Sequence, residues 1–215
     1  MVWQRARSED QKEVRRRALL EAAARLHASH PLEEISLSRI ARAANVSKAN
    51  VYRYFGSREE LFLELMREAL EAWRDVLVRR LEALAGGEDP DALARAFAVT
   101  VVEHPRFARL AAVLTTVLER NVGVDAVAAF KRSFVDAGRP LREAIRGAFP
   151  SWSEEQAQHL LELAYHLLVA LWPAAHPAPA VAQALERPEL AGMRMDFEEA
   201  YAAALVTVAR GVGSG

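Results

Sequence analysis

The sequence predicts an all-α fold, with three N-terminal helices followed by a larger C-terminal helical bundle. Apolar residues recur at helical rather than alternating spacing in almost every periodic stretch, and no run of β-branched residues stands between turn signals. Capping residues and Gly or Pro breaks mark where the helices begin and end. With 215 residues, 52% of them apolar, and a net charge of -1, the chain can bury a core and is not expected to be disordered.

The first helix is predicted over about residues 9–29. Ser8-x-x-Gln11 has the spacing of a capping box, and an apolar stripe with helical spacing follows it. His30 and Pro31 come directly after this stripe, and proline cannot continue a helix.

Two short helices should follow, because capping residues recur at close intervals. Ser36 or a neighbour can cap a brief helix that stops near Asn45, a residue type that tolerates the left-handed conformation of a helix end. Ser47 can cap a third helix over about residues 48–54, before Gly56.

The remaining helices are longer. Ser57-x-x-Glu60 is a second capping box, which opens a helix that ends at Gly86-Gly87. A kink or a break is expected at Gly138-Arg139-Pro140, and residues 176–195 should form a loop with a short helix near 180–186. The other predicted helices cover residues 91–103, 106–121, 125–148, 153–172 and 196–210.

Composition limits where the protein acts and what it does. There is no cysteine, no apolar stretch follows the basic N-terminus, and the apolar run Leu163–Ala175 is shorter than the ~20 residues of a membrane span. We therefore expect a soluble cytoplasmic protein with no membrane contact. Residues 1–58 carry 12 Lys or Arg and 6 Asp or Glu, whereas residues 59–215 carry 16 and 23. The basic N-terminal quarter indicates either phosphate binding or a solvated basic surface.

The two short helices and their tight turn suggest a helix-turn-helix. They cannot bury enough surface alone, so the inward residues need the first helix beneath them. Ser47 at the start of the third helix would leave backbone N–H groups free for a phosphate. The outward residues combine a small side chain, an amide, two cations and an aromatic hydroxyl, which suits a DNA groove: Lys48, Ala49, Asn50, Tyr52 and Arg53.

Over roughly residues 12–66 the chain resembles the N-terminal domain of TetR/AcrR-family transcriptional regulators. Three segments carry the resemblance: Ala22-Ala23, the run from Ser36 to Ser47, and the run from Val51 to Leu61. The sequence departs from the common pattern at His30, Asn45 and Ala49-Asn50, where the family often has Gly, Gly and Gly-Thr. Asparagine serves the turn as well as glycine would, so the departure at Asn45 does not change the expected fold. The departure at Ala49-Asn50 affects the base preference instead.

The resemblance implies roles for individual residues. Contacts to the DNA backbone would come from Ser36, Arg39, Tyr52, Tyr54 and Arg58, and the residues nearest the bases would be Lys48, Ala49, Asn50 and Arg53. The tyrosines could instead be aromatic core, as we expect for Phe55. Arg15, Arg16 and Arg17 are interpreted as a solvated face with some attraction to DNA.

We expect a DNA-binding domain at residues 1–57 and an effector-binding and dimerisation domain at 58–215. The helix from Gln156 to Trp172 is apolar on nearly every side, and the last helix offers small residues for close approach, so the two could form a homodimer interface. The alternative is that both are core helices of a monomer. The interface residues named are Leu160, Leu161, Leu168, Ala203 and Thr207.

An apolar pocket for a small apolar or amphipathic effector is expected between the long fourth helix and the interface helices. Six aromatic residues are candidates for its lining, although aromatic residues at helical spacing are more often plain packing: Phe97, Phe107, Phe130, Phe134, Tyr165 and Trp172. His159 and His166 share a helix face, but two imidazoles alone make a weak metal site, so we favour hydrogen-bonded interface or pocket roles.

No cofactor and no metal are expected, and no enzyme activity, because the sequence has no nucleophile with its base, no phosphate-binding glycine loop and no paired carboxylates. The resulting hypothesis is a ligand-responsive regulator, most simply a repressor. It would bind a pseudo-palindromic double-stranded operator as a homodimer and be released by a small-molecule effector. The alternative is an α-helical small-molecule-binding protein whose basic N-terminus only mimics a DNA reader, and an enzyme with an unrecognised site ranks third.

Overall fold

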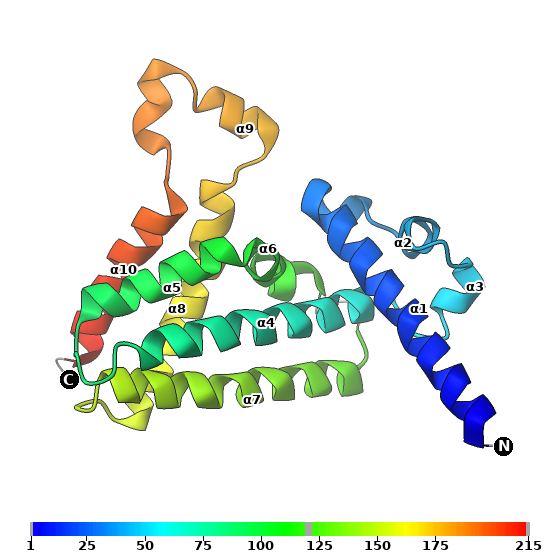
Figure 1. The fold of residues 1–215 in the computed structure, drawn as a ribbon. Helices are drawn as coiled ribbons and strands as arrows, with labels where there is room; N and C mark the ends of the chain where they lie inside the picture. The colour runs from blue at the N-terminus through cyan, green and yellow to red at the C-terminus, as the bar shows by residue number, and fades with distance from the viewer. Residues whose placement is uncertain (1, 119–121, 214–215) are drawn as a thin grey trace.

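A computed structural model of the chain describes residues 2–118 and 122–213, without the side chains of residues 2–10 (Figure 1). Every regular element in these residues is helical, so the all-α prediction is confirmed. The α-helices are α1 (Val2–Ser29), α2 (Leu37–Ala43), α3 (Lys48–Val51), α4 (Arg58–Glu82), α5 (Pro90–Glu103), α6 (Pro105–Val113), α7 (Val124–Ala148), α8 (Glu154–Ala175), α9 (Pro179–Ala184) and α10 (Phe197–Gly213).

α1 is longer than predicted. It begins at Val2, so Ser8 lies inside the helix and its predicted capping role is wrong. The residues before Ser8, from Gln4 to Arg7, are mostly good helix formers, which is why the helix extends past the predicted start. α2 and α3 pack on one side of α1, and a core of Leu19, Ala23, Ile40, Val51 and Leu61 joins the unit (Figure 1).

α4 connects the N-terminal helices to the rest of the molecule. The Ser57 side chain accepts a hydrogen bond from the Glu60 amide at 3.0 Å, while the Glu60 carboxylate accepts from the Gly56 amide at 2.8 Å instead of closing the predicted box on Ser57. The first turns of α4 are buried among the N-terminal helices, and its later turns, from Trp73 to Leu81, are buried in the C-terminal core.

Two ion pairs fix α1 to α4. Arg16 pairs with Glu64, and Arg17 pairs with Glu68 at 3.0 Å. Arg16 is half-buried, so it is not part of the freely solvated face that was predicted for Arg15, Arg16 and Arg17. Burial raises the pKa of Glu64, but its bonds to Arg67 and Arg16 outweigh this and the net shift is downward. The carboxylate therefore stays ionised and holds the two helices together.

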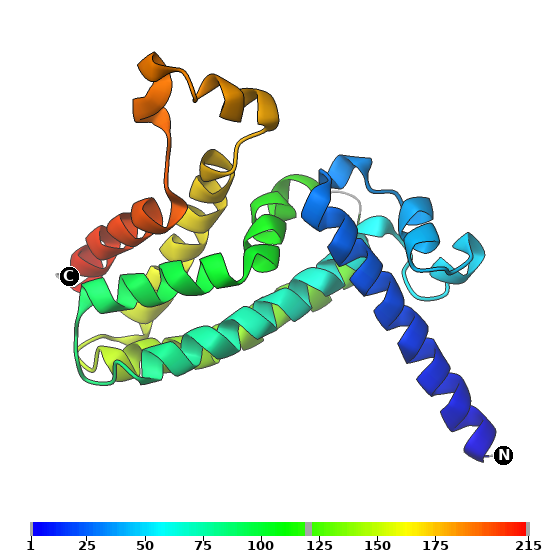
Figure 2. The same cartoon turned by 45° about the horizontal axis from the view of Figure 1, so that its top comes forward.

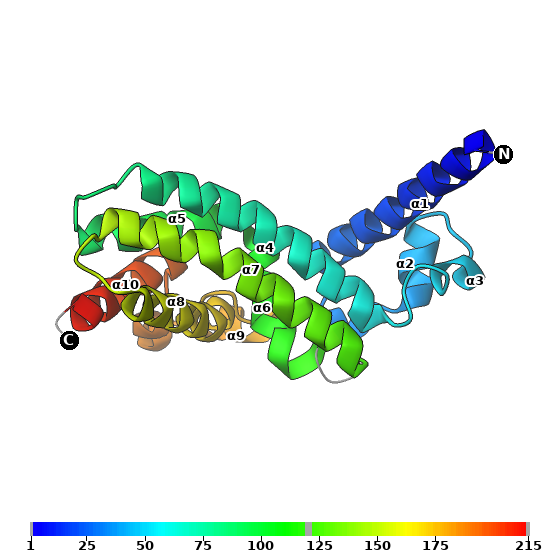
Figure 3. The same cartoon turned by 90° about the horizontal axis from the view of Figure 1, so that it is seen from below.

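The C-terminal bundle surrounds α4. α7 lies beside α4 along most of its length, and α10 packs between α5 and α8 (Figures 1 and 3). Near the start of α10, Tyr201 is fully buried and donates a hydrogen bond to the Ala164 carbonyl of α8 at 2.9 Å. Burial raises the pKa of Tyr201 far above its ordinary value, so the phenol remains a donor.

Several predicted boundaries in this half differ. α6 passes into a π-helical segment, Leu114–Leu118, and the predicted end at Asn121 lies outside the described residues. α7 runs through Pro140 without a break, because the carbonyl that loses its amide partner belongs to solvent-exposed Asp136. Pro173, predicted at a boundary, lies in the last turn of α8. Beyond α9 only a short 3₁₀ segment, Pro188–Met193, precedes α10.

Within the described residues, no helix has the length and apolar character needed to cross a membrane.

Candidate DNA-binding surface and ligand cavity

The turn between α2 and α3 is a helix terminator built on Asn45. Ser36 caps the start of α2 by accepting from the Arg39 amide at 3.2 Å. At the other end, the Val46 amide bonds to the Ala41 carbonyl at 2.9 Å and Asn45 has φ of 54°. This pairing is the Schellman arrangement, which requires a left-handed residue and turns the chain sharply into α3.

α3 is shorter than predicted, because it ends at Val51 and residues 52–54 form turns. Ser47 stands at its N-terminus but its hydroxyl makes no capping bond, so the predicted side-chain cap is absent. Val51 and Phe55 are buried, as expected for Phe55. These two anchors leave a set of exposed or half-buried side chains on the outer face: Ser47, Lys48, Ala49, Asn50, Tyr52 and Arg53.

The residues that the family resemblance assigns to the DNA backbone fall into two groups. Tyr52 is 54% exposed, which is high for an aromatic side chain, and Tyr54 is half-buried against the core. The other three have roles inside the fold. Ser36 is a cap, Arg39 donates to the Glu34 carbonyl at 3.3 Å, and Arg58 pairs with Glu59 and donates to two carbonyls of the loop before α2.

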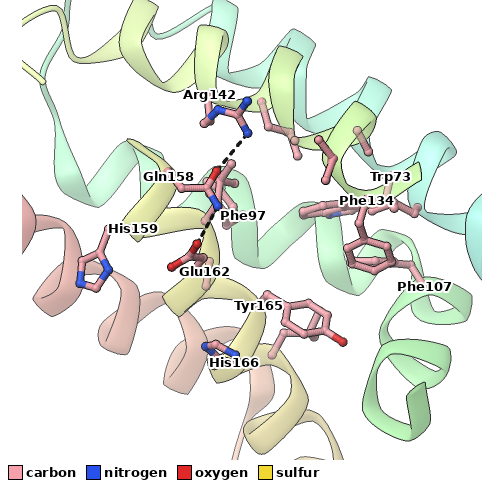
Figure 4. Close-up of a pocket in the computed structure, with 18 of the residues that line it drawn as sticks. Trp73, Phe97, Phe107, Phe134, Arg142, Gln158, His159, Glu162, Tyr165 and His166 are labelled. Carbon is pink, nitrogen blue, oxygen red and sulfur yellow. Dashed lines mark hydrogen bonds between the residues drawn. The ribbon is translucent and has the colours of Figure 1, made fainter. Parts of the chain in front are cut away.

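A cavity of about 1050 Å³ opens among α4, α5, α6, α7, α8 and α10. Its apolar end is aromatic, with Trp73 stacked on Phe107 at 4.4 Å between ring centroids, and Phe134 edge-on to Tyr165 at 5.9 Å (Figure 4). Trp73 is fixed by a hydrogen bond from its indole N–H to the buried Thr100 hydroxyl at 3.2 Å. This bond and the stacking on Phe107 hold Trp73 in place at the wall of the cavity.

The other end of the cavity is polar (Figure 4). Arg142 donates to the Gln158 amide oxygen at 3.0 Å, and Gln158 donates in turn to Glu162 at 2.7 Å. Glu154 and Glu155 also line this end, so three carboxylates face one guanidinium. The cavity thus joins an aromatic end to a polar end that carries an excess of negative charge.

Four of the six aromatic residues named from the sequence line this cavity: Phe97, Phe107, Phe134 and Tyr165. Phe130 is instead buried behind Phe134, with ring centroids 5.1 Å apart, and Trp172 lies elsewhere against His176 and Phe197. The sequence reasoning missed the polar end and Trp73, because Trp73 belongs to a continuous apolar stripe that by itself indicates only core.

His159 and His166 both line the cavity and are exposed. In the part of the chain that the structure describes, no three His, Asp or Glu side chains are grouped so that they could hold a metal ion.

The predicted interface residues do not share one surface. Leu160 and Leu168 are 0% and 1% exposed and belong to the chain's own core, so they cannot contact a second copy as predicted. Leu161 is half-buried, whereas Ala203 and Thr207 are exposed on α10. The helix periodicity could not separate these faces, because α8 is apolar nearly all round.

Comparison with known proteins agrees with this architecture. Residues 19–65 match the family described as bacterial regulatory proteins, tetR family, and residues 67–214 match the Tetracyclin repressor-like C-terminal domain. The HTH-type transcriptional regulator BetI of Rhizobium meliloti (strain 1021) is 40% identical over 72 residues, which span 34% of this chain and only 36% of BetI.

Solved structures share the fold at low sequence identity. The fatty acid degradation regulator FadR from Bacillus halodurans has a TM-score of 0.57 at 15% identity, covering 94% of this chain and 95% of that chain. RolR in complex with resorcinol has a TM-score of 0.55 at 17% identity, covering 96% of both chains. Since the two matched family domains together cover most of the sequence, the chain belongs to the TetR family, whose members are transcriptional regulators with a DNA-binding helix-turn-helix and not enzymes.

Proposed function

We propose that the protein is a ligand-responsive repressor that binds a pseudo-palindromic operator as a homodimer and leaves it when a small amphipathic effector fills the cavity. It would act in the cytoplasm, on the DNA that it regulates. The observation that carries the proposal is the outer face of α3. Lys48 at the start of α3 and Tyr52 directly after its end are exposed, while Val51 and Phe55 are buried and anchor the same segment to the core.

This face has the properties of a groove-reading surface. Side chains that protrude at the N-terminus of the second helix of such a motif reach base edges, while neighbouring cations and hydroxyls contact phosphates. Lys48 and Asn50 would read bases, and Tyr52 would contact the backbone. Arg39 and Arg58 would contribute less, because their guanidinium groups already bond to backbone carbonyls of the domain.

The cavity supports a small effector with an aromatic body and a hydrogen-bond donor. Trp73 and Phe107 offer a flat apolar surface, and the carboxylates of Glu154, Glu155 and Glu162 offer acceptors. The fold relative RolR holds resorcinol, a small aromatic molecule with two hydroxyl donors.

α4 provides the connection between effector and DNA. Leu70 and Trp73 of α4 line the cavity, while Leu61 and Phe62, on the same helix, are buried among the N-terminal helices. A ligand that displaces the middle of α4 would therefore move the α1–α3 unit with it. Because half-sites on DNA are ~34 Å apart, a shift of a few Å in each unit would lose specific contacts.

The homodimer would use the exposed faces of α8 and α10, which pack against each other (Figure 3). Ala203 and Thr207 lie one turn apart on the exposed side of α10 and allow close approach of a second helix. An Ala203→Glu variant should be a monomer when light scattering is measured after size exclusion. Ala129→Glu, at an exposed position of α7, should remain a dimer. A monomeric wild type, or a dimeric A203E, would remove this interface.

The test of DNA reading is operator binding as a function of salt. The wild type should prefer DNA from its own upstream region to random DNA, and its affinity should fall steeply with salt. Lys48→Ala should weaken operator binding by at least ~10-fold and narrow the gap between operator and random DNA, because each copy of the dimer loses a base contact. The matched control is Arg95→Ala, which removes one exposed positive charge from α5.

Equal affinity for operator and random DNA would favour the alternative of a small-molecule-binding protein without DNA specificity. A K48A variant that matches R95A would show that α3 is not the reading helix.

A further inference from the structure

A second cavity, of about 890 Å³, lies where the N-terminal helices meet the C-terminal bundle. Its walls come from the end of α1 and the following loop, from α6, and from the facing ends of α8 and α10. The last turns of α1 stand beside α6 in Figure 2. This junction cavity shares no lining residue with the cavity described above.

The junction cavity contains buried polar atoms without partners. His27 is 9% exposed, and both of its ring nitrogens are shielded from water without a hydrogen bond of normal geometry. The Nε of Arg109 is in the same situation. Buried polar groups are almost always paired, because each unpaired one costs about 1–3 kcal/mol. His27 and Arg109 both line the junction cavity, so a bound group could satisfy these nitrogens once the two side chains turn toward it.

The charges around the junction cavity determine which kind of group could pair with these nitrogens. Burial lowers the pKa of His27, and the charge of Arg109 lowers it further, while the His30 backbone and the Glu33 carboxylate act more weakly in the opposite direction. Burial and the neighbouring Arg106 also lower the pKa of Arg109. His27 is therefore neutral near pH 7, and the positive charge on this wall belongs to Arg109.

The carboxylates on the same wall do not neutralise this charge. Glu33, Asp196 and Glu198 are exposed, and Asp196 accepts from the Glu199 amide at 2.9 Å at the start of α10. Among the described residues no ion pair is formed by Arg109, which distinguishes it from Arg142 in the first cavity, whose guanidinium lies 3.5 Å from Glu154.

The rest of the junction cavity is apolar and partly aromatic. Trp172 stacks on His176 with 4.0 Å between ring centroids and meets Phe197 edge-on at 4.9 Å. Val102, Val113 and Pro105 complete this surface. An occupant would therefore have an apolar body and a single anionic head.

We propose that the junction cavity binds a monocarboxylic acid, with its carboxylate between Arg109 and His27 and its apolar body against Trp172. The carboxylate would supply two acceptor oxygens, one for the Arg109 guanidinium and one for the N–H of neutral His27. The acid would touch α1 and α6 at once, so it would also restrain the DNA-binding unit against the bundle. This last consequence rests on the proposed function.

The experiment is calorimetric titration of the full-length protein, without DNA, with 4-phenylbutanoate and with its neutral isostere 4-phenylbutanamide. The acid should bind at least ~10-fold more tightly than the amide, since only the acid carries a negative charge that can pair with the Arg109 guanidinium. Arg109→Met should lose at least ~10-fold in acid affinity and lose the preference for the acid. Arg142→Met, the same change in the first cavity, should retain both.

Thermal stability separates a binding role from a structural one. Because Arg109 forms no ion pair with the described residues and its Nε is unpaired, R109M should melt at the same temperature as the wild type or higher. His27→Gln keeps a polar side chain and should weaken acid binding less than R109M.

Four results would overturn the proposal: no acid binding at ~10 mM, equal affinity for acid and amide, loss of binding in R142M instead of R109M, or a marked drop in the melting temperature of R109M. Operator binding is measured separately, so failure of the acid to bind would leave the proposed repressor function standing.

Discussion

The turn at Asn45 offers a test of how the helix-turn-helix is held in place. Asn45 has φ of 54°, is exposed, and makes only a backbone bond, from its amide to the Arg42 carbonyl at 3.2 Å. A residue with a Cβ in this conformation costs about 1–2 kcal/mol, a penalty that asparagine partly escapes and glycine does not incur. Asn45→Ala should therefore lower the free energy of unfolding by about 1 kcal/mol, and Asn45→Gly should change it by less than ~0.5 kcal/mol.

The assay is urea unfolding followed by circular dichroism, supported by thermal melting. For a protein of this length, 1 kcal/mol corresponds to a shift of ~2–4 °C in the melting temperature. N45A should also weaken operator binding, because strain in the turn is relieved by moving α3. An N45A variant as stable as the wild type would refute the strain argument. An N45G variant as unstable as N45A would instead show that the asparagine side chain itself matters.

Other predictions concern buried groups. Phe55→Ala should cost about 3–5 kcal/mol and abolish operator binding, because Phe55 is 5% exposed beneath α3, whereas Phe55→Leu should cost less than ~1.5 kcal/mol; similar denaturation midpoints for the two variants would contradict this. Burial lowers the pKa of His27 below its ordinary 6.5, so below about pH 6.5 the unfolded chain binds a proton that the folded chain does not. Stability should fall on that acidic side, and less steeply in His27→Gln; identical pH profiles from pH 7 to 5 would argue against it. Tyr201→Phe should cost about 0.5–1.5 kcal/mol through loss of its bond to the Ala164 carbonyl, measured by urea unfolding, and a neutral change would mean that water replaces the bond.

Local signals in the sequence determined much of this protein. Ser36, Asn45 and Ser57 act on the backbone within a few residues of themselves, so the starts of α2 and α4 and the turn before α3 could be predicted. The same local reasoning predicted that Lys48 and Tyr52 point outward, and both are exposed. It did not predict that α3 ends at Val51, before Tyr52.

Tertiary packing decided the rest, because it depends on residues far apart in the chain. Periodicity showed that α8 is apolar nearly all round, but only the position of α10 decides that Leu160 faces the core while Ala203 faces solvent. Phe130 and Phe134 are both phenylalanines of one helix, and the packing of α7 decides that Phe134 lines the first cavity while Phe130 is buried behind it. His27 and Arg109 lie 82 residues apart in the sequence, so only the folded chain shows that both line the junction cavity with unpaired nitrogens.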